Sequence, residues 1–256
     1  MSQKIIEIIG PPGIGKSTFY KFLCKRWKPS YNWTYQDKLL APDKPKINDF
    51  KNWLTYKSKR ILGKKLSTSL STDLGLRFIN HNPELAGFYW KLLSDPLVYD
   101  KTNVDSRFRA AYFLFQDFCR YQAVMEKPNN KPCLMNEGLL QKAFFTQLSK
   151  LELEEKLNEY MNIIPNSIHA IIYLSTPNTG IILERLLHRD KVIASHIGKK
   201  SDELLVDIKN WQYMLDLIVE KAKTKGIRVF KIDGADELSI NSEYIMNALD
   251  SYSISK

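Results

Sequence analysis

A glycine-rich stretch near the amino terminus has the residue types and spacing of a phosphate-binding loop. Its residues, Gly10-Pro11-Pro12-Gly13-Ile14-Gly15-Lys16-Ser17-Thr18, fit the pattern G-x-x-x-x-G-K-S/T. Glycine at 10, 13 and 15 lets main-chain N–H groups wrap a phosphate, because no Cβ stands in the way. Lys16 is placed to reach the β- and γ-phosphates, and the Ser17 hydroxyl to bind Mg²⁺. The stretch therefore predicts binding of ATP or a similar nucleoside triphosphate together with Mg²⁺.

A second polar group follows a later apolar run. Asn136 and Glu137 come directly after Pro132-Cys133-Leu134-Met135. Functional groups of open α/β sheets collect at the carboxyl ends of the strands, so both residues reach the phosphate loop if the two strands are neighbours. Glu137 is then a candidate general base toward an acceptor hydroxyl, or a group that holds Mg²⁺ through water. A carboxylate that merely caps a turn is the alternative.

The helix predicted over 106–126 places four candidate acceptor-binding side chains on one face. Arg109, Phe113, Gln116 and Arg120 recur at steps of four, three and four residues. Such a face suits an anionic or heteroaromatic ligand, because arginine grips phosphate through a bidentate fork and phenylalanine stacks on rings. Pairing of the arginines with acidic neighbours such as Asp105 and Asp117 is the alternative.

Two further arginines are candidates for the chemical step. Arg185 and Arg189 stand four residues apart in a helix predicted to begin at Pro177-Asn178, ahead of a lysine-rich loop. Arginines on such a lid-like segment, here 185–200, can close over the transferred phosphoryl group and neutralise its charge. A pair that only complements the helix dipole is the alternative.

The elements that must position these residues alternate along the chain. Strands are predicted at 5–9, 132–138, 168–174 and 227–233, with a short one at 31–35. Helices are predicted after the phosphate loop and at 106–126, 141–161, 177–189 and 201–225. Strands that alternate with helices require a parallel sheet covered on both faces. The predicted fold is a single α/β domain, residues 1–256, with a parallel β-sheet core and a mainly helical insertion.

Residues 31–105 are expected to form that insertion, as a lid or acceptor-binding segment outside the nucleotide-binding core. A basic amphipathic helix is predicted within it, from Asp49 to about Leu66. Its basic residues are Lys51, Lys57, Lys59, Arg60, Lys64 and Lys65. The helix either binds a membrane surface or polyanion, or packs its apolar side on the core and leaves its lysines solvated.

The composition is typical of a globular protein in a reducing compartment. The 256 residues are 44% hydrophobic and 26% charged. No apolar run approaches the roughly 20 residues of a membrane span, and the first strand begins too early to leave room for a signal peptide. Cys24, Cys119 and Cys133 have neither disulfide nor metal-ligand spacing and are interpreted as core thiols. We therefore expect a cytoplasmic protein. Its net charge of +10 favours anionic partners without choosing among them.

The order of these features resembles the P-loop small-molecule kinases, in particular the thymidylate kinase and deoxynucleoside kinase branch. The resemblance covers residues 4–28 and about 106–240. Besides the phosphate loop it rests on Phe115, Gln116 and Arg120, on Tyr173-Leu174 … Pro177 … Glu184-Arg185 … Arg189, and on Ile232-Asp233-Gly234. In that family the corresponding segments meet the nucleobase, clasp the phosphates and lie against the adenine. The resemblance implies an ATP- and Mg²⁺-dependent phosphotransferase.

One departure from that family concerns the acceptor. Its members carry Asp-Arg or Glu-Arg at the end of the third core strand, whereas this chain has Asn136-Glu137-Gly138. An acceptor phosphate would lack its arginine partner there. The departure therefore favours a hydroxyl acceptor activated by Glu137.

The sequence thus predicts a kinase that moves the γ-phosphate of ATP to a small-molecule acceptor, foremost a nucleoside or nucleotide. A sugar, glycan or lipid-linked hydroxyl is one alternative acceptor, and a nucleotide-dependent switch or slow ATPase is a different class of function. The expected partners are the triphosphate and the acceptor. Contact of the basic segment with an anionic surface and formation of a homodimer stay open. Nucleic-acid binding is not expected, because the chain carries no reader motif.

Overall fold

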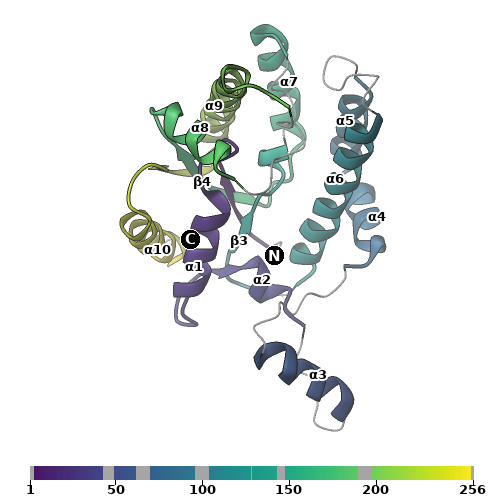
Figure 1. Ribbon diagram of the computed structural model, residues 1–256. Coiled ribbons are helices and arrows are strands. Elements are labelled where there is room, and N and C mark those ends of the chain that lie inside the picture. The colour runs from purple at the N-terminus through teal and green to yellow at the C-terminus, as the bar shows by residue number, and fades with distance from the viewer. Residues whose placement is uncertain are drawn as a thin grey trace.

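The computed structural model describes residues 3–42, 49–61, 70–95, 104–127, 129–142, 148–189 and 198–254. At its centre is a five-stranded sheet in the order β2-β3-β1-β4-β5, in which every pairing is parallel. The strands are β1 (Ile5–Ile9), β2 (Thr34–Tyr35), β3 (Cys133–Asn136), β4 (Ile168–Ser175) and β5 (Arg228–Asp233). Helices lie on both faces of this sheet (Figure 1), which confirms the predicted α/β class.

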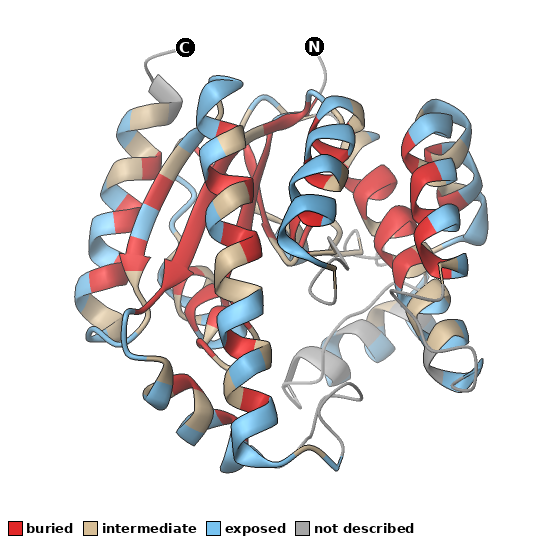
Figure 2. Ribbon diagram, turned by 90° about the horizontal axis from the view of Figure 1, so that it is seen from above, coloured by how far each residue is buried: buried red, intermediate tan, exposed pale blue. Residues whose placement is uncertain are grey.

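The central strand β1 divides the core into two apolar clusters. All five of its residues are buried, and successive side chains point to opposite faces of the sheet. Ile5 and Ile9 belong to one cluster, and Ile6 and Ile8 to the other. Figure 2 shows the buried strands enclosed by helices whose outer sides are exposed. Glu7 is the exception in this strand, because it is charged and lies on the same face as Ile5 and Ile9.

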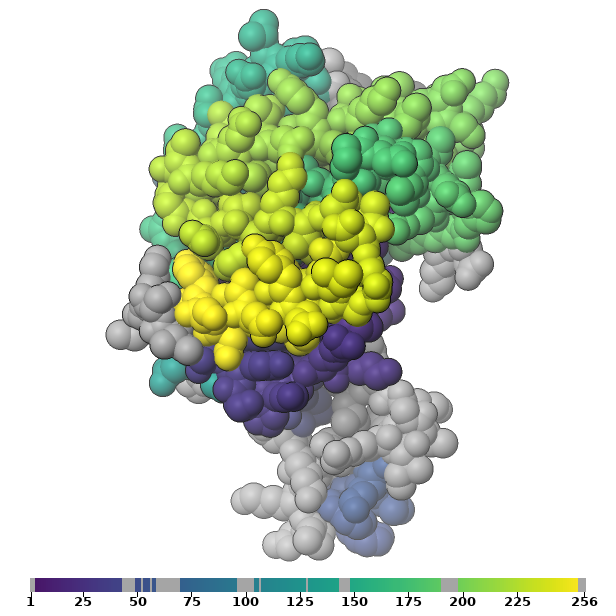
Figure 3. Space-filling model, turned by 90° about the vertical axis from the view of Figure 1, so that its left-hand side faces the viewer, coloured from purple at the N-terminus to yellow at the C-terminus, as the bar shows by residue number. Residues whose placement is uncertain are grey.

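Different helices cover the two clusters. The side chains of Ile6 and Ile8 pack under α1 (Lys16–Arg26), α8 (Thr179–Leu187) and α10 (Leu238–Ile254). Figure 3 shows α10 lying along α1 on this side of the molecule. The side chains of Ile5 and Ile9 pack under α4 (Thr72–His81), α5 (Pro83–Ser94), α6 (Val104–Met125) and α7 (Lys150–Ile163). The long helix α9 (Ser201–Thr224) contributes to both clusters.

Described parts of the segment 31–105 contribute to the core, although the sequence predicted this segment to lie outside the nucleotide-binding core. Thr34–Tyr35 forms the edge strand β2, which pairs with β3. Phe78 of α4 and Tyr89 of α5 are buried in the same cluster as Ile5 and Ile9. The segment also holds the short helix α2 (Gln36–Leu39) and the helix α3 (Phe50–Ile61). The rest of the basic helix predicted to Leu66 lies outside the described residues. No described helix is long and apolar enough to cross a membrane.

The helix predicted over 141–161 is wrong at its beginning, because two separate elements occupy that range. Leu140–Lys142 forms a short 3₁₀ turn, η1, and α7 begins only at Lys150. Ser149 caps α7, since its hydroxyl accepts the Glu152 N–H (3.4 Å) while the Glu152 carboxylate accepts the Ser149 N–H (3.1 Å). The turn η1 therefore stays beside the end of β3, where Gln141 and Lys142 contact the site described next.

Candidate active site

The phosphate loop joins the buried strand β1 to the first turn of α1. Gly13 (φ 87°) and Gly15 (φ 107°) adopt the left-handed conformation that a side chain disfavours. A Cβ on Gly13 would also come within 2.7 Å of Leu186 of α8. The backbone at these two positions of the loop therefore requires glycine. The side chains of Ser17 and Thr18, in the first turn of α1, are exposed.

Lys16 lies inside this loop and binds it. Its Nζ donates to the carbonyl oxygens of Gly10 (2.7 Å) and Pro11 (3.1 Å), and only 7% of the residue is exposed. Burial lowers the pKa of Lys16 to about 8, and the positive charges of Lys142 and Arg189 act in the same direction. The negative charge of Glu137 opposes this shift, so these three residues lie within electrostatic range of the loop lysine.

Glu137 occupies the turn that follows β3, next to the phosphate loop. Because β3 pairs directly with β1, with Asn136 opposite Ile8, the two carboxyl ends stand side by side, which meets the condition set by the sequence analysis. Glu137 has a φ of 61°, and no other described residue except glycine has a positive φ. Its side chain is 40% exposed and its carboxylate lies 3.8 Å from Lys142 Nζ. The carboxylate is thus accessible to a bound acceptor.

A pocket of about 400 Å³ lies between α6 and this turn. Phe113, Gln116 and Arg120 line it together with Glu137 and Lys142. Three of the four residues predicted to bind the acceptor therefore meet the predicted general base. Arg109 is not among the described residues that line the pocket; its guanidinium lies 3.9 Å from the Asp105 carboxylate and is mostly exposed.

The charged groups of the pocket form one network. The Asp117 carboxylate accepts from Arg120 Nη1 (2.5 Å) and lies 3.1 Å from Lys142 Nζ. Lys142 in turn approaches Glu137. Two cations and two carboxylates thus balance one another, so the pairing of Arg120 with an acidic neighbour, considered above as an alternative, does occur. It occurs inside the pocket.

The two arginines expected over the phosphates are placed differently from one another. Arg185 donates from Nη1 to the carbonyl oxygens of Ile14 (3.0 Å) and Gly234 (2.9 Å), and so joins the phosphate loop to the loop after β5. Arg189 does not share a helix face with it, because α8 ends at Leu187 and His188 is its C-cap. The helix that was predicted to carry both arginines therefore ends before Arg189. Half of the lid-like segment 185–200, residues 190–197, lies outside the described residues.

The residues present fit a magnesium–nucleotide complex. No group of three or more acidic, histidine or cysteine side chains suited to a metal occurs among the described residues. Mg²⁺ does not need one, because it is usually held by one or two protein oxygens together with substrate phosphates and water. The buried Asn136 Oδ1 has no hydrogen-bond partner in the described part of the chain. With the Ser17 hydroxyl, this oxygen would hold the ion or one of its waters.

Four residues at the site were not predicted from the sequence as functional. Glu7 is fully buried and its two carboxylate oxygens accept the N–H groups of Leu139 (3.0 Å) and Leu140 (2.9 Å). Burial raises the pKa of Glu7 to about 7. Gln141, also buried, accepts the Gly10 N–H on Oε1 (3.0 Å), and Asp117 and Lys142 belong to the pocket network. One signal was available, because a glutamate in the middle of Ile5-Ile6-Glu7-Ile8-Ile9 needs buried partners.

Comparison with known proteins gives structural neighbours only. No protein-family model and no curated protein matches the chain. A deoxyadenosine kinase from M. mycoides with bound dATP is 15% identical, with coverage of 96% of this chain and 99% of that one and a TM-score of 0.46. A shikimate kinase from Bacteroides thetaiotaomicron is 11% identical (coverage 96% and 98%, TM-score 0.39). A gluconokinase from Sinorhizobium meliloti 1021 is 13% identical (coverage 98% and 94%, TM-score 0.36).

Proposed function

We propose that the protein is a kinase that transfers the γ-phosphoryl group of ATP to a hydroxyl of an uncharged small molecule bound in the α6 pocket. One observation carries this proposal. Glu137 follows β3, whose carboxyl end lies beside that of β1 and the phosphate loop, and it also lines the pocket with Phe113 and Gln116. A carboxylate at the junction of a triphosphate site and a second pocket is placed to accept the proton of an attacking hydroxyl.

The charge balance of the pocket supports an uncharged acceptor. Arg120 and Lys142 already pair with Asp117, and Lys142 also approaches Glu137, so an acceptor phosphate would have to break these pairs to find a counter-charge. A hydroxyl-bearing compound needs no such exchange. The ring of Phe113 and the amide of Gln116 suit a heteroaromatic group, by stacking and by hydrogen bonding. A nucleoside is therefore the first acceptor to test, and a sugar the second.

The chain's own residues have distinct tasks in this transfer. The N–H groups of the phosphate loop and the ammonium of Lys16 bind the β- and γ-phosphates. Ser17 and Asn136 would hold Mg²⁺, which would supply charge neutralisation. Glu137 accepts the proton of the acceptor hydroxyl as its oxygen attacks the γ-phosphorus and the bond to ADP breaks. Arg189, beyond the end of α8, is the arginine available to the transferring group, whereas Arg185 is hydrogen-bonded to Gly234 in the loop after β5.

A screen of ADP release tests the proposal. The protein is incubated with Mg²⁺ and ATP, and with nucleosides, nucleoside monophosphates and sugars as separate acceptors. We expect at least one uncharged hydroxyl compound to stimulate ADP release and to appear as its phosphate ester by mass spectrometry. Glu137→Gln should lower kcat for that acceptor by roughly 10²- to 10⁴-fold, the usual contribution of a general base.

The controls separate the kinase from a slow ATPase. Lys16→Ala should abolish every acceptor-stimulated reaction, because the γ-phosphate loses its cation. The exposed Lys21→Ala, also on α1, should leave the rate unchanged. ADP release that is equally fast with and without every acceptor, and that is indifferent to Glu137→Gln, would show a nucleotide hydrolase or switch instead.

A further inference from the structure

The turn that carries Glu137 is fastened by a buried side chain of the central strand. Glu7 lies in the middle of β1, and both of its carboxylate oxygens accept main-chain N–H groups, those of Leu139 and Leu140. These residues follow Glu137 by two and three positions. Gly138 lies directly against the carboxylate, since a Cβ there would come within 2.1 Å of Glu7 Cδ. Glu7 therefore fixes the backbone on the carboxyl side of Glu137.

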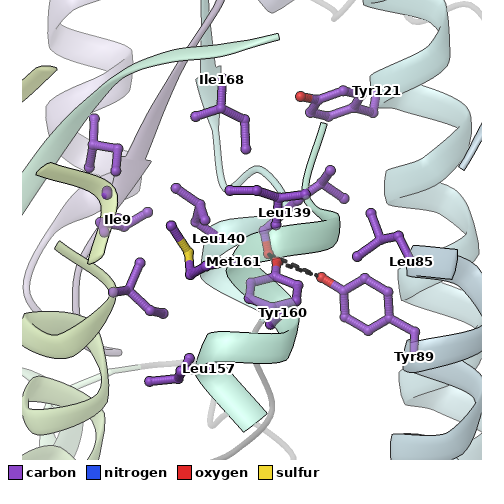
Figure 4. Close-up of a cluster of buried hydrophobic side chains, with 14 of the residues drawn as sticks. Ile9, Leu85, Tyr89, Tyr121, Leu139, Leu140, Leu157, Tyr160, Met161 and Ile168 are labelled. Carbon is purple, nitrogen blue, oxygen red and sulfur yellow. Dashed lines mark hydrogen bonds between the residues drawn. The ribbon is translucent and has the colours of Figure 1, made fainter. Parts of the chain in front are cut away.

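The same turn is also held from its other side. The Leu139 carbonyl accepts from the Tyr160 hydroxyl (2.7 Å), which lies 2.9 Å from the Tyr89 hydroxyl (Figure 4). These donors come from α7 and α5, and all the groups involved are buried. In the peptide group between Leu139 and Leu140, the N–H therefore donates to Glu7 of β1, and the carbonyl oxygen accepts from tyrosines of α7 and α5. Such a peptide has little freedom to shift.

The turn then reaches the phosphate loop through its next residues. Gln141 accepts the N–H of Gly10, the first residue of that loop, and Lys142 approaches both Asp117 and Glu137. One rigid turn therefore contacts the triphosphate side and the acceptor side of the site. Glu137 itself has a left-handed backbone, a conformation that costs free energy in residues other than glycine and persists where its surroundings impose it.

We propose that Glu7 is a positioning residue of the phosphoryl transfer, which acts by holding Glu137 at the junction between the phosphate loop and the acceptor pocket. This inference rests on the proposed kinase function. It assigns a task to a carboxylate that lies outside the pocket and touches neither substrate. Its loss is expected to lower kcat more than it changes the affinity for ATP.

Two variants disturb this contact from opposite sides. Glu7→Gln has the same shape, but its amide NH₂ faces a main-chain N–H where an acceptor stood. Gly138→Ala leaves the Glu7 residue unchanged, but its added Cβ displaces the Glu7 carboxylate. We expect each to lower kcat roughly 10- to 100-fold, the effect of misplacing a reacting group by about 1 Å, with the Kd of ATP changed by less than about 3-fold. Activities are expressed per folded molecule, measured by near-ultraviolet circular dichroism.

A double-mutant cycle with Glu137→Gln separates positioning from general stability. If Glu7 acts through Glu137, adding Glu7→Gln to Glu137→Gln should lower kcat by less than about 3-fold further. Gln3→Met is the matched control, because Gln3 is a buried residue just before β1 whose Nε2 donates to the Lys131 carbonyl (2.7 Å), at the far end of the strands. It should lower the melting temperature without changing kcat. Tyr160→Phe removes only the hydroxyl that donates to the Leu139 carbonyl. It should lower kcat as well, but by less than Glu7→Gln or Gly138→Ala.

The outcomes are distinct. A wild-type protein that phosphorylates an acceptor, with Glu7→Gln and Gly138→Ala within about 2-fold of its kcat, would overturn the inference and leave the kinase proposal standing. Effects of Glu7→Gln and Glu137→Gln that simply multiply would overturn it as well. If the two severe variants do not fold, Tyr160→Phe decides by the same cycle. A wild-type protein without acceptor-stimulated turnover would overturn the proposed function first, and this inference with it.

Discussion

Burial of Lys16 favours a neutral amine, whereas its proposed role in phosphate binding needs the charged ammonium. Without nucleotide its ammonium is satisfied by two carbonyl oxygens, yet burial lowers its pKa from 10.5 to about 8. Between these two values the unfolded chain holds more protons than the folded one, so the free energy of unfolding of the nucleotide-free protein rises with pH in that window. Nucleotide binding has the opposite sign, because phosphates favour the charged lysine.

We therefore predict proton uptake when ATP binds at alkaline pH. At pH 8.5 most of the Lys16 side chains are neutral, and binding should take up roughly 0.7 proton per site. Isothermal titration calorimetry in two buffers of different ionisation enthalpy measures this number. Lys16→Met should bind weakly and show no dependence on the buffer. A wild-type binding enthalpy that is the same in both buffers would contradict the placement of the charge.

At this scale, residue types and spacing could predict which residues are candidates for the site but not the partners of those residues. The phosphate loop and Glu137 were predicted because their signals are local, a motif and a strand end. Lys142 was not, because its relation to Asp117 and Glu137 depends on where η1 turns. For Arg120 the sequence left ligand binding and pairing with Asp117 as alternatives, since a sequence does not show that this carboxylate faces the same pocket.

At the scale of elements, the close pair α4 and α6 positions the acceptor side of the site. Gly75 of α4 allows this approach, because a Cβ there would come within 2.5 Å of the Phe115 ring and 2.8 Å of Cys119 Sγ on α6. Phe115 and Gln116 are adjacent on that helix. The spacing of the two helices therefore affects the residues that line the pocket.

Two glycine-to-alanine changes in neighbouring helices should have opposite effects on stability. Alanine favours a helix by about 1 kcal/mol over glycine, whereas overpacking costs about 1–3 kcal/mol. Gly75→Ala should thus lower the free energy of unfolding by about 1 kcal/mol net, because the clash outweighs the gain. Gly87→Ala in α5 should raise it by up to about 1 kcal/mol, since nothing lies within 4 Å of its added Cβ. Urea denaturation measures both, and a stabilised Gly75→Ala protein would show that α4 adjusts freely.

The elements that the sequence predicted best are those with long, regular patterns. The helices α6 and α9 and the strands β1 and β4 have the expected places, because apolar periodicity over many residues leaves few alternatives. The turn η1 was merged with α7, since its three residues carry no pattern of their own. The sequence predicted that α8 continues past Leu187, because Arg189 follows Arg185 at the four-residue spacing of a helix.

For the whole molecule, the clearest consequence of the proposed function is stabilisation by nucleotide. A ligand that binds only the folded chain, present at 100 times its Kd, adds about 2.7 kcal/mol to the free energy of unfolding. For a domain of this size that corresponds to a rise in Tm of roughly 5–10 °C. Differential scanning fluorimetry with Mg²⁺ and a non-hydrolysable ATP analogue measures it. Lys16→Ala should lose most of the shift, and an unchanged Tm in the wild-type protein would argue against the nucleotide site.

The order of the strands could not be read from the chain, yet it decides the site. The polar ends of β3 and β1 meet because these strands are neighbours, which the sequence stated only as a condition. Residues 31–105 were set apart because no motif linked them to the core. The described part of this segment supplies the edge strand β2 and the buried Tyr89. Their partners, β3 and Tyr160, lie far away in the sequence, so the sequence alone did not link them to the core.

The guanidinium of Arg185 has a consequence for movement. It donates to Ile14 in the loop after β1 and to Gly234 in the loop after β5, and so connects two loops whose strands are separated by β4. Both loops are thereby attached to α8. Any ligand that draws this side chain toward itself must release the two loops from each other in the same motion.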